Sequence, residues 1–194
     1  MPDIFPFISY VLIATFTPGP NNIMAMTKAG KHGLKRSLAF NIGVFSGFFI
    51  IMVLSSLFSS ALLTYIPMIK PYLSYVGALY ILWLAYKVFK SSYKEGKSSE
   101  PGKNSYVQGV LMQFVNPKAI LFGLTVVSSF IVPYYDSVIV LIVFSISLAA
   151  VALIATSCWS LFGSLFNQLM TKHYKMLNVI MALLLVYAAV SLVI

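Results

Sequence analysis

The stretch TPGPNN, residues 17–22, lies in the middle of an apolar run that extends from Ile4 to Met26 without a charged residue. A run of this length is long enough to cross a bilayer as an α-helix. Pro18 and Pro20 cannot donate a backbone hydrogen bond, and each disfavours the helical conformation of the residue before it. Gly19 between them relaxes the backbone further. We therefore predict two half-helices that meet at this stretch.

A break inside a membrane span is costly, because each backbone group left unpaired in hydrocarbon costs several kcal/mol. Such breaks persist where protein or a watery cavity receives the freed groups, and transporters use them as substrate sites. The first half-helix should end near Phe16 and the second should begin near Asn21. The alternative is a proline kink of structural value only. The coincidence of three helix-disrupting residues with two amides favours the functional interpretation.

The composition is that of a membrane protein. Of the 194 residues, 60% are hydrophobic and 9% are charged, and the mean hydropathy is +0.92. Soluble domains carry about 25% charged residues. The length predicts one membrane transport domain, residues 1–194, without a separate soluble domain. The single cysteine, Cys158, excludes an internal disulfide.

The net charge of +9 is distributed in a way that indicates membrane orientation. Lysine and arginine gather around three connectors, at residues 28–36, 87–103 and 172–175, whereas Lys70 is alone between the second and third apolar segments. Positive charge in alternate connectors is typical of loops on the cytoplasmic side. The charge therefore predicts that both termini lie outside, and it gives no support for nucleic acid as a partner.

The apolar segments predict an all-α integral membrane protein. Six transmembrane helices are expected at residues 4–27, 37–63, 72–89, 106–132, 137–167 and 176–194, with a short connector at 64–71. The polar segment 90–105 is typical of a flexible cytoplasmic linker. The linker separates a first three-helix half, residues 1–89, from a second, residues 106–194. With three spans each, the halves must be inverted relative to one another, and the first and fourth helices are interrupted.

The interruption of the fourth span is the segment Asn116-Pro117-Lys118. Pro117 removes a helix hydrogen bond, and Asn116 can pair with a freed group. Lys118 is the only charged residue well inside any span; a charge there costs roughly 2.5 kcal/mol or more and marks a functional candidate. The alternative is that its amine snorkels to the cytoplasmic interface. Paired breaks in corresponding positions of two halves point to a transporter site at their interface.

A zwitterionic substrate would find complementary groups at these breaks. The N–H groups that begin the second half-helix should meet its carboxylate, and the carbonyl groups that end the first should accept from its ammonium. A polar asparagine in the second span, a tyrosine deep in the third and a phenylalanine beside the second break complete the set. The predicted substrate-binding residues are Thr17, Pro18, Gly19, Pro20, Asn21, Asn22, Asn41, Tyr80, Phe114, Asn116, Pro117 and Lys118.

At these residues the chain resembles the LysE/RhtB family of amino-acid exporters. Residues 18–21 resemble the family's PGP motif, residues 77–83 (GALYILW) its third-span pattern, and residues 116–119 its NPKA segment. The order, the spacing and the total length agree along essentially the whole chain. The resemblance implies a bacterial inner-membrane secondary transporter that exports amino acids or close derivatives by alternating access. Many members have an acidic residue where this chain has Phe48, so no acidic proton carrier is visible in any span.

Two other functions are weighed against this one. Export of a metal ion or another small solute is the first alternative, but cations need carboxylate, thiolate or imidazole ligands, and the spans contain only Cys158. An intramembrane enzyme is less favoured, because both histidines lie in connectors. We therefore predict no enzymatic activity, no metal site and no cofactor. The expected partners are an amino-acid substrate and the lipid bilayer, with a homo-oligomer left open.

Overall fold

The computed structural model describes residues 4–90, 105–166 and 173–190, and every regular element within these ranges is helical. The first half contains α1 (Ile4–Phe16), α2 (Pro20–His32), α3 (Leu34–Leu57) and α4 (Ser59–Lys90). The second contains α5 (Ser105–Phe114), α6 (Pro117–Val126), the π-helical turn η1 (Val127–Ile131), α7 (Val138–Leu165) and α9 (Tyr174–Val190).

The described helices are those of a membrane protein by length and composition. α3 and α7 are each long and apolar enough to cross a membrane alone. α5 and the segment Pro117–Ile131 form a third candidate, bent by 60°. α1 and most of α9 are shorter apolar helices. The all-α membrane architecture is confirmed at this level, whereas the six-span count and the inverted arrangement stay predictions.

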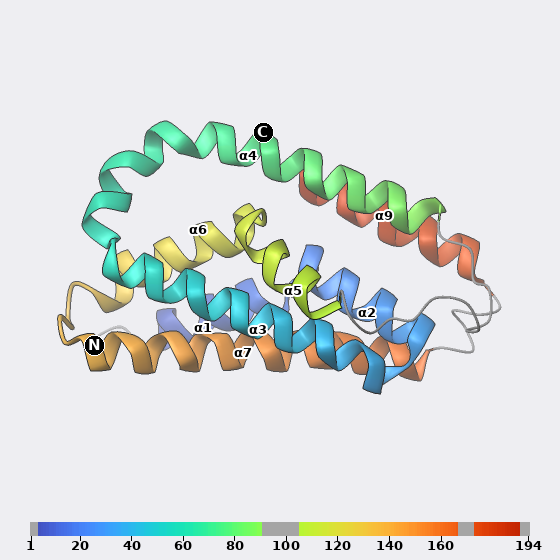
Figure 1. The fold of residues 1–194 in the computed structure, drawn as a ribbon, viewed down its shortest axis with the longest axis horizontal. Helices are drawn as coiled ribbons and strands as arrows, with labels where there is room; N and C mark the ends of the chain where they lie inside the picture. The colour runs from blue at the N-terminus through green and yellow to red at the C-terminus, as the bar shows by residue number, and fades with distance from the viewer. Residues whose placement is uncertain (1–3, 91–104, 167–172, 191–194) are drawn as a thin grey trace.

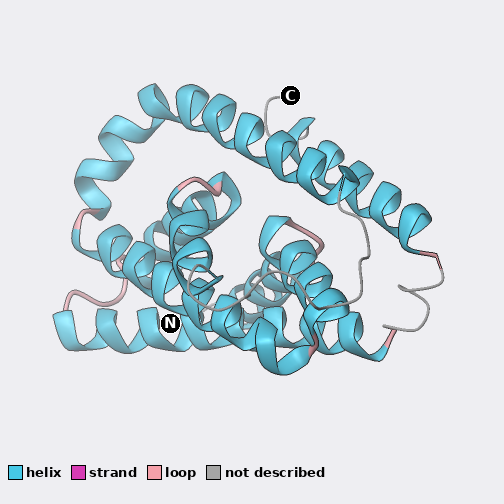
Figure 2. Ribbon diagram, turned by 45° about the vertical axis from the view of Figure 1, so that its right-hand side comes forward, coloured by secondary structure: helices cyan, strands magenta, loops and turns pink. Residues whose placement is uncertain are grey.

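The helices form two groups with the half-helices between them. α3 packs against α5 and α7, and α2 packs against α7. α4 packs along α9 on the opposite side of the molecule (Figure 1). The view turned by 45° shows the same separation, with the short helices enclosed by the longer ones (Figure 2). The chain breaks therefore lie between the two groups.

The hydrophobic core consists of two clusters that share α3. One cluster joins α2, α3, α4, α5 and α9 around residues such as Ile23, Phe40 and Leu185, which are fully buried. The other joins α1, α3, α6, η1 and α7 around Met52 and Val126. α1 and α2 thus belong to different clusters, as do α5 and α6. Each break lies where the chain passes from one cluster to the other.

Glycines allow the closest helix crossings. A Cβ atom on Gly109 of α5 would meet the carbonyl oxygen of Phe40 on α3, and one on Gly43 would meet that of Tyr106. A Cβ atom on Gly163 of α7 would likewise meet the carbonyl oxygen of Met26 on α2. Small residues at these positions let the backbones approach directly, as in many membrane helix pairs.

One predicted boundary is wrong. The sequence predicts a second span to residue 63 and a connector at residues 64–71, but α3 ends at Leu57 and α4 is already helical from Ser59. A helix can contain prolines if it bends, because each proline lacks the N–H donor of one helix hydrogen bond. α4 curves strongly over its first part (Figure 1). One long helix is predicted over residues 137–167, and it is confirmed as α7. The predicted linker falls almost entirely outside the described residues.

Candidate functional site

The first break separates α1 from α2. α1 ends at Phe16 and α2 begins at Pro20, so the predicted discontinuity is confirmed. Pro20 occupies the first helical position, where the missing N–H would have no partner within the helix. Gly19 precedes it in an extended conformation (φ −166°, ψ 177°) and provides no side-chain cap. The Gly19 carbonyl accepts from the Ile23 N–H at 2.9 Å, but the N–H groups of Asn21 and Asn22 receive no side-chain acceptor from the cap residue.

The second break separates α5 from α6, and it is also confirmed. α5 ends at Phe114, α6 begins at Pro117, and the two axes differ by 60°. Asn116 is extended (φ −94°, ψ 100°), and its side-chain oxygen accepts a hydrogen bond of 3.2 Å from the backbone N–H of Lys118. This is the geometry of a helix N-cap. The second break thus provides its own cap.

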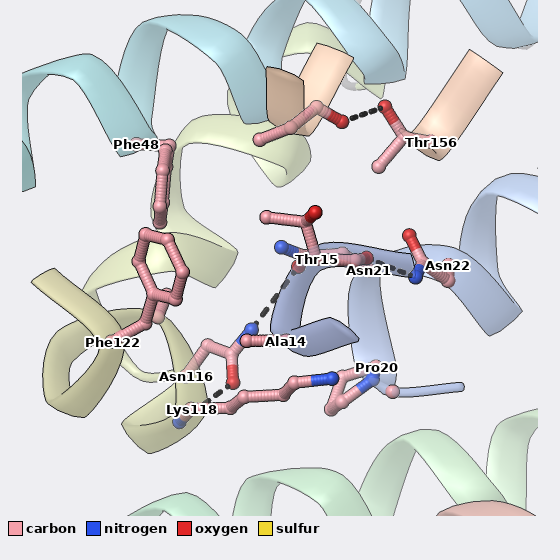
Figure 3. A pocket seen from close by; sticks show the side chains of 13 residues that line it. Ala14, Thr15, Pro20, Asn21, Asn22, Phe48, Asn116, Lys118, Phe122 and Thr156 are labelled. Carbon is pink, nitrogen blue, oxygen red and sulfur yellow. Dashed lines mark hydrogen bonds between the residues drawn. The ribbon is translucent and has the colours of Figure 1, made fainter. Parts of the chain in front are cut away.

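Both breaks line one cavity of about 50 Å³, which is room for a few water molecules. We call it the break cavity; Figure 3 shows residues of both halves pointing into it. Its lining residues are Ala14, Thr15, Gly19, Pro20, Asn21, Asn22, Phe48, Asn116, Lys118, Ala119, Phe122, Ala152 and Thr156. None of these described residues is acidic.

Three amide side chains join the breaks across the cavity. Asn21 donates to the Gln113 side-chain oxygen at 2.9 Å, and Gln113 donates back to Asn21 at 3.1 Å. The Asn116 amide donates to the same Asn21 oxygen at 3.3 Å. Gln113 and Asn116 are almost completely buried. Because buried amides are costly when unpaired, this network fixes the two breaks side by side.

The last carbonyl groups of α1 receive donors from three side chains. Asn22 donates from one nitrogen to the carbonyl oxygens of Thr15 (2.8 Å) and Thr17 (2.9 Å). The indole nitrogen of Trp159, on α7, donates to the Phe16 carbonyl oxygen at 3.1 Å. The C-terminal end of a helix carries a partial negative charge and has no intrahelical donors. The predicted acceptors for a substrate ammonium are therefore already bonded within the chain.

Lys118 is the third donor. Its ammonium lies 2.9 Å from the Thr17 hydroxyl oxygen and 3.3 Å from the Thr17 carbonyl oxygen. The side chain crosses from the beginning of α6 to the end of α1, in the direction of Pro20 (Figure 3). A Cβ atom on Gly19 would lie only 3.2 Å from the Lys118 nitrogen. The ammonium is thus held at the first break.

Lys118 also borders a second, larger space. A chamber of about 540 Å³ separates the first break and α6 from the α4–α9 pair, and we call it the α4–α9 chamber. Thr17, Pro18 and Lys118 line it together with apolar residues of α4, α6 and α9, among them Ile81 and Leu184. Gly19, Pro20, Ala14 and Phe122 line both spaces along with Lys118.

Four of the predicted site residues, Asn41, Tyr80, Phe114 and Pro117, line neither space. Asn41 is fully buried and donates to Ser160 of α7 at 3.0 Å, which ties α3 to α7. Tyr80 packs against Trp83 (ring centroids 5.6 Å apart) and the neighbouring core cluster. Phe114 is 40% exposed at the end of α5. Pro117 lies directly after Asn116, and the other predicted residues lie at the two breaks.

Several residues around the break cavity were not predicted: Gln113, which bonds the lining residue Asn21, and the lining residues Thr15, Phe48, Phe122 and Thr156. Gln113 could have been found from the sequence, because it is a polar residue inside an apolar span, three residues before Asn116. Thr15 and Thr156 look like ordinary helix residues, and Thr156 donates within its own helix to the Ala152 carbonyl at 2.9 Å. Phe48 and Phe122 contact each other with ring centroids 5.5 Å apart. Nothing local in the sequence distinguishes these residues from the other apolar side chains.

A group of metal ligands is not found in the described parts of the chain. Among residues 4–90, 105–166 and 173–190, no three His, Cys, Asp or Glu side chains are grouped closely enough to hold a metal ion. The described polar groups around the breaks are amides, hydroxyls, carbonyls and one ammonium. These are groups that bind small polar organic molecules through hydrogen bonds.

Comparison with known proteins identifies the family. The family model described as LysE type translocator matches residues 12–194. The chain belongs to the LysE type translocator family. Its similar curated relatives include the "Cysteine/O-acetylserine efflux protein" of Escherichia coli strain K12 and that of Shigella flexneri. Each is 39% identical over 187 residues, which are 96% of this translocator and 95% of the relative. No solved structure matches.

Proposed function

We propose that this translocator exports small neutral amino acids and close derivatives from the cytoplasm, as a secondary transporter that works by alternating access. The family and the names of its relatives, which are efflux proteins for cysteine and O-acetylserine, support amino-acid export across the bacterial inner membrane. The observation that carries the proposal is the convergence of both chain breaks on one cavity that contains amide groups and the Lys118 ammonium. Paired half-helices at such a site are the arrangement that transporters use for their substrates.

The proposed position of the carboxylate is at the start of α2. The first-turn N–H groups of α2 have no side-chain cap, and the positive end of a helix attracts an anion. The Asn21 amide lies beside them, and the Lys118 ammonium is the one cation among the described residues that line the break cavity. A carboxylate therefore meets both directed donors and positive charge there.

The same lining argues for a small, uncharged side chain. The cavity is narrow, Phe48 and Phe122 form one wall, and the hydroxyls of Thr15 and Thr156 lie among the lining groups. A lysine or arginine side chain would bring a second cation toward Lys118 without an acidic partner among these described lining residues. Unpaired like charges in a poorly hydrated site are strongly unfavourable. Thiol, hydroxyl and acetyl groups avoid that penalty.

An export assay tests the substrate class. Cells that express the chain are loaded with labelled cysteine, O-acetylserine or lysine, and the rate of appearance outside is measured against cells with an empty vector. We expect faster export of cysteine and O-acetylserine and unchanged export of lysine. Export of lysine alone would contradict the neutral class. Lack of export of every amino acid, with the protein present in the membrane, would contradict the proposed function itself.

The proposed topology has six spans in two inverted halves with both termini outside. Its support is that corresponding elements pair, α3 with α7 and α4 with α9, and that each half begins with a broken span. In a Cys158→Ser background, a cysteine at Asp136 should react with an impermeant thiol reagent added outside. A cysteine at Gly96, in the linker outside the described residues, should not. The reverse pattern would invert the topology.

A further inference from the structure

The Lys118 ammonium takes the place that a substrate's amino group would need. Its hydrogen-bond partners in the described chain are both oxygens of Thr17, at the end of α1. That end combines a carbonyl oxygen, a hydroxyl oxygen and the negative pole of the α1 dipole, which together suit a primary ammonium. From the geometry we propose that the end of α1 is a primary-ammonium subsite, that Lys118 fills it when no substrate is bound, and that the α-ammonium of the substrate replaces Lys118 there.

The inference rests on the proposed export of zwitterionic amino acids and specifies which groups of the protein recognise the zwitterion. The other donors at this helix end are fixed, because Asn22 is almost completely buried and bonds two carbonyls at once. Lys118 is held differently, because both of its hydrogen-bond acceptors belong to Thr17, a residue of the first break. Its long side chain can leave without removing a donor from Thr15 or Phe16.

Space for the displaced side chain is present. Lys118 lies at the boundary of the break cavity and the α4–α9 chamber, and the chamber alone measures about 540 Å³. Gly19 leaves room for the lysine to lie across the break, since even a Cβ atom there would be within 3.2 Å of its nitrogen. The flexible stem can therefore swing from Thr17 into the chamber without repacking the core.

The exchange would make both charges of the substrate necessary. When the substrate's ammonium binds Thr17, the freed Lys118 ammonium is available to the substrate's carboxylate. A ligand with only an ammonium would release Lys118 without giving it a partner, and a ligand with only a carboxylate would not replace it. Lys118 would then determine the specificity for α-amino acids. No acidic residue among the described cavity lining would be needed for this.

The test compares a ligand with both charges, a ligand with only the ammonium and a neutral ligand. Wild type, Lys118→Met and Lys118→Gln are purified in detergent, and the binding of cysteine, cysteamine and 2-mercaptoethanol is measured by calorimetry. We expect wild type to bind cysteine and to bind cysteamine only weakly. Lys118→Met should bind cysteamine about tenfold or more tightly than wild type, the scale of one exchanged hydrogen bond to a charged group. Neutral 2-mercaptoethanol should gain nothing, which excludes simple filling of vacated volume.

A second substitution locates the subsite. In the Lys118→Met background, Thr17→Val removes the hydroxyl acceptor while keeping the shape of the side chain, and it should reverse most of the cysteamine gain. Lys90→Met is the matched control, because Lys90 also donates to a hydroxyl, that of Tyr86 at 3.2 Å, at the far end of α4. Its binding of all three ligands should equal that of wild type.

The outcomes separate this inference from the proposed function. No cysteamine gain in either folded Lys118 variant, or a gain that Thr17→Val leaves intact, would overturn the ammonium subsite. If Lys118→Met does not fold, Lys118→Gln gives the same answer, since it also lacks the charge. Failure of wild type to bind or export cysteine would contradict the substrate class, while cysteamine binding by the variants would still report on the subsite.

Discussion

The two chain breaks differ in where their backbone partners come from. At the second break, Asn116 caps α6 from within the break itself, through one hydrogen bond to Lys118 N–H. At the first break, the carbonyl end of α1 depends on Asn22 from the next helix and on Trp159 and Lys118 from the other half of the chain. The second break carries its own cap, whereas the first depends partly on donors from the other half of the chain.

This difference assigns different roles to the breaks. A locally capped break keeps its geometry when neighbouring helices move, so the α5–α6 corner suits a stable support for the cavity. A break closed by distant donors changes when those donors move, and its uncapped α2 end leaves N–H groups for a ligand. The first break is therefore where substrate binding and movement of the halves can be coupled. Stability measurements can challenge this contrast.

The largest effect is expected for Asn22→Leu. The Asn22 amide satisfies two carbonyl oxygens of α1 and is 3% exposed, so leucine leaves both carbonyls without that donor. The Thr17 carbonyl keeps the Lys118 ammonium at 3.3 Å, so the half-buried Thr15 carbonyl is the one that loses its side-chain donor. An unsatisfied group of this kind costs about 1–3 kcal/mol, and we expect a loss in that range in the free energy of unfolding. Denaturation in detergent, followed by circular dichroism, measures it. A loss no larger than that of an Asn116 variant would contradict the stronger dependence of the first break on side-chain donors.

A smaller effect is expected for Asn116→Ala at the second break. Losing an N-cap costs about 1 kcal/mol, and the bond from Asn116 to Asn21 is long at 3.3 Å. Asn116→Ser is the matched variant, because serine is an equally good cap but is too short to reach Asn21. We expect serine to restore most of the stability in the same denaturation assay. A serine variant as unstable as the alanine variant would show that the amide network, and not the cap, closes this break.

These two breaks are also the part of the molecule that the sequence predicts best. Pro18, Pro20 and Pro117 act on the backbone of their own neighbours, so their consequence is local and visible in the sequence. The structure confirms both discontinuities and brings Asn21, Asn116 and Lys118 together. The connector at residues 64–71 was predicted by the same rule and is wrong, because a helix with a bend can keep its prolines.

The partners across the cavity are beyond sequence reasoning for a physical reason. Asn41 and Gln113 both carry amide side chains inside apolar spans. Asn41 nevertheless forms a hydrogen bond with Ser160 of α7, whereas Gln113 forms one with Asn21. Which partner each amide finds depends on helix rotation and on the close crossings at Gly43 and Gly109, which juxtapose α3 and α5. Trp159 is similar: only the packing of α7 beside α1 brings its indole to the Phe16 carbonyl.

A still smaller loss in the free energy of unfolding is expected for Trp159→Phe. Phenylalanine keeps an aromatic ring and removes only the donor to the Phe16 carbonyl, which is one hydrogen bond of 3.1 Å on the exposed side of the break. One such bond contributes about 0.5–1.5 kcal/mol. Trp83→Phe on α4 is the control, since its ring contacts Tyr80 and Lys87 away from both breaks. Equal losses in the unfolding assay for both substitutions would mean that the indole donor does not close the first break.

The smallest effect on stability is expected for Gly19→Ala. Gly19 is extended, with φ −166°, a conformation that alanine adopts without strain. The added Cβ atom would lie 3.2 Å from the nitrogen and 3.4 Å from the Cδ atom of Lys118, so the flexible end of that side chain has to give by a few tenths of an ångström. Removing a glycine from the unfolded chain stabilises by about 0.4–1 kcal/mol, which offsets the adjustment.

We therefore expect the unfolding free energy of Gly19→Ala to stay within about 1 kcal/mol of wild type. Gly19→Val is the sharper comparison, because its two methyl groups push the Lys118 ammonium off Thr17 while the extended backbone is retained. By the exchange proposed above, the valine variant should bind cysteamine more tightly than wild type without a matching loss of stability, since the displaced Lys118 ammonium no longer competes for Thr17. If alanine alone destabilises as strongly as Asn22→Leu, the first break is a packed structural joint, and the contrast with the second break disappears.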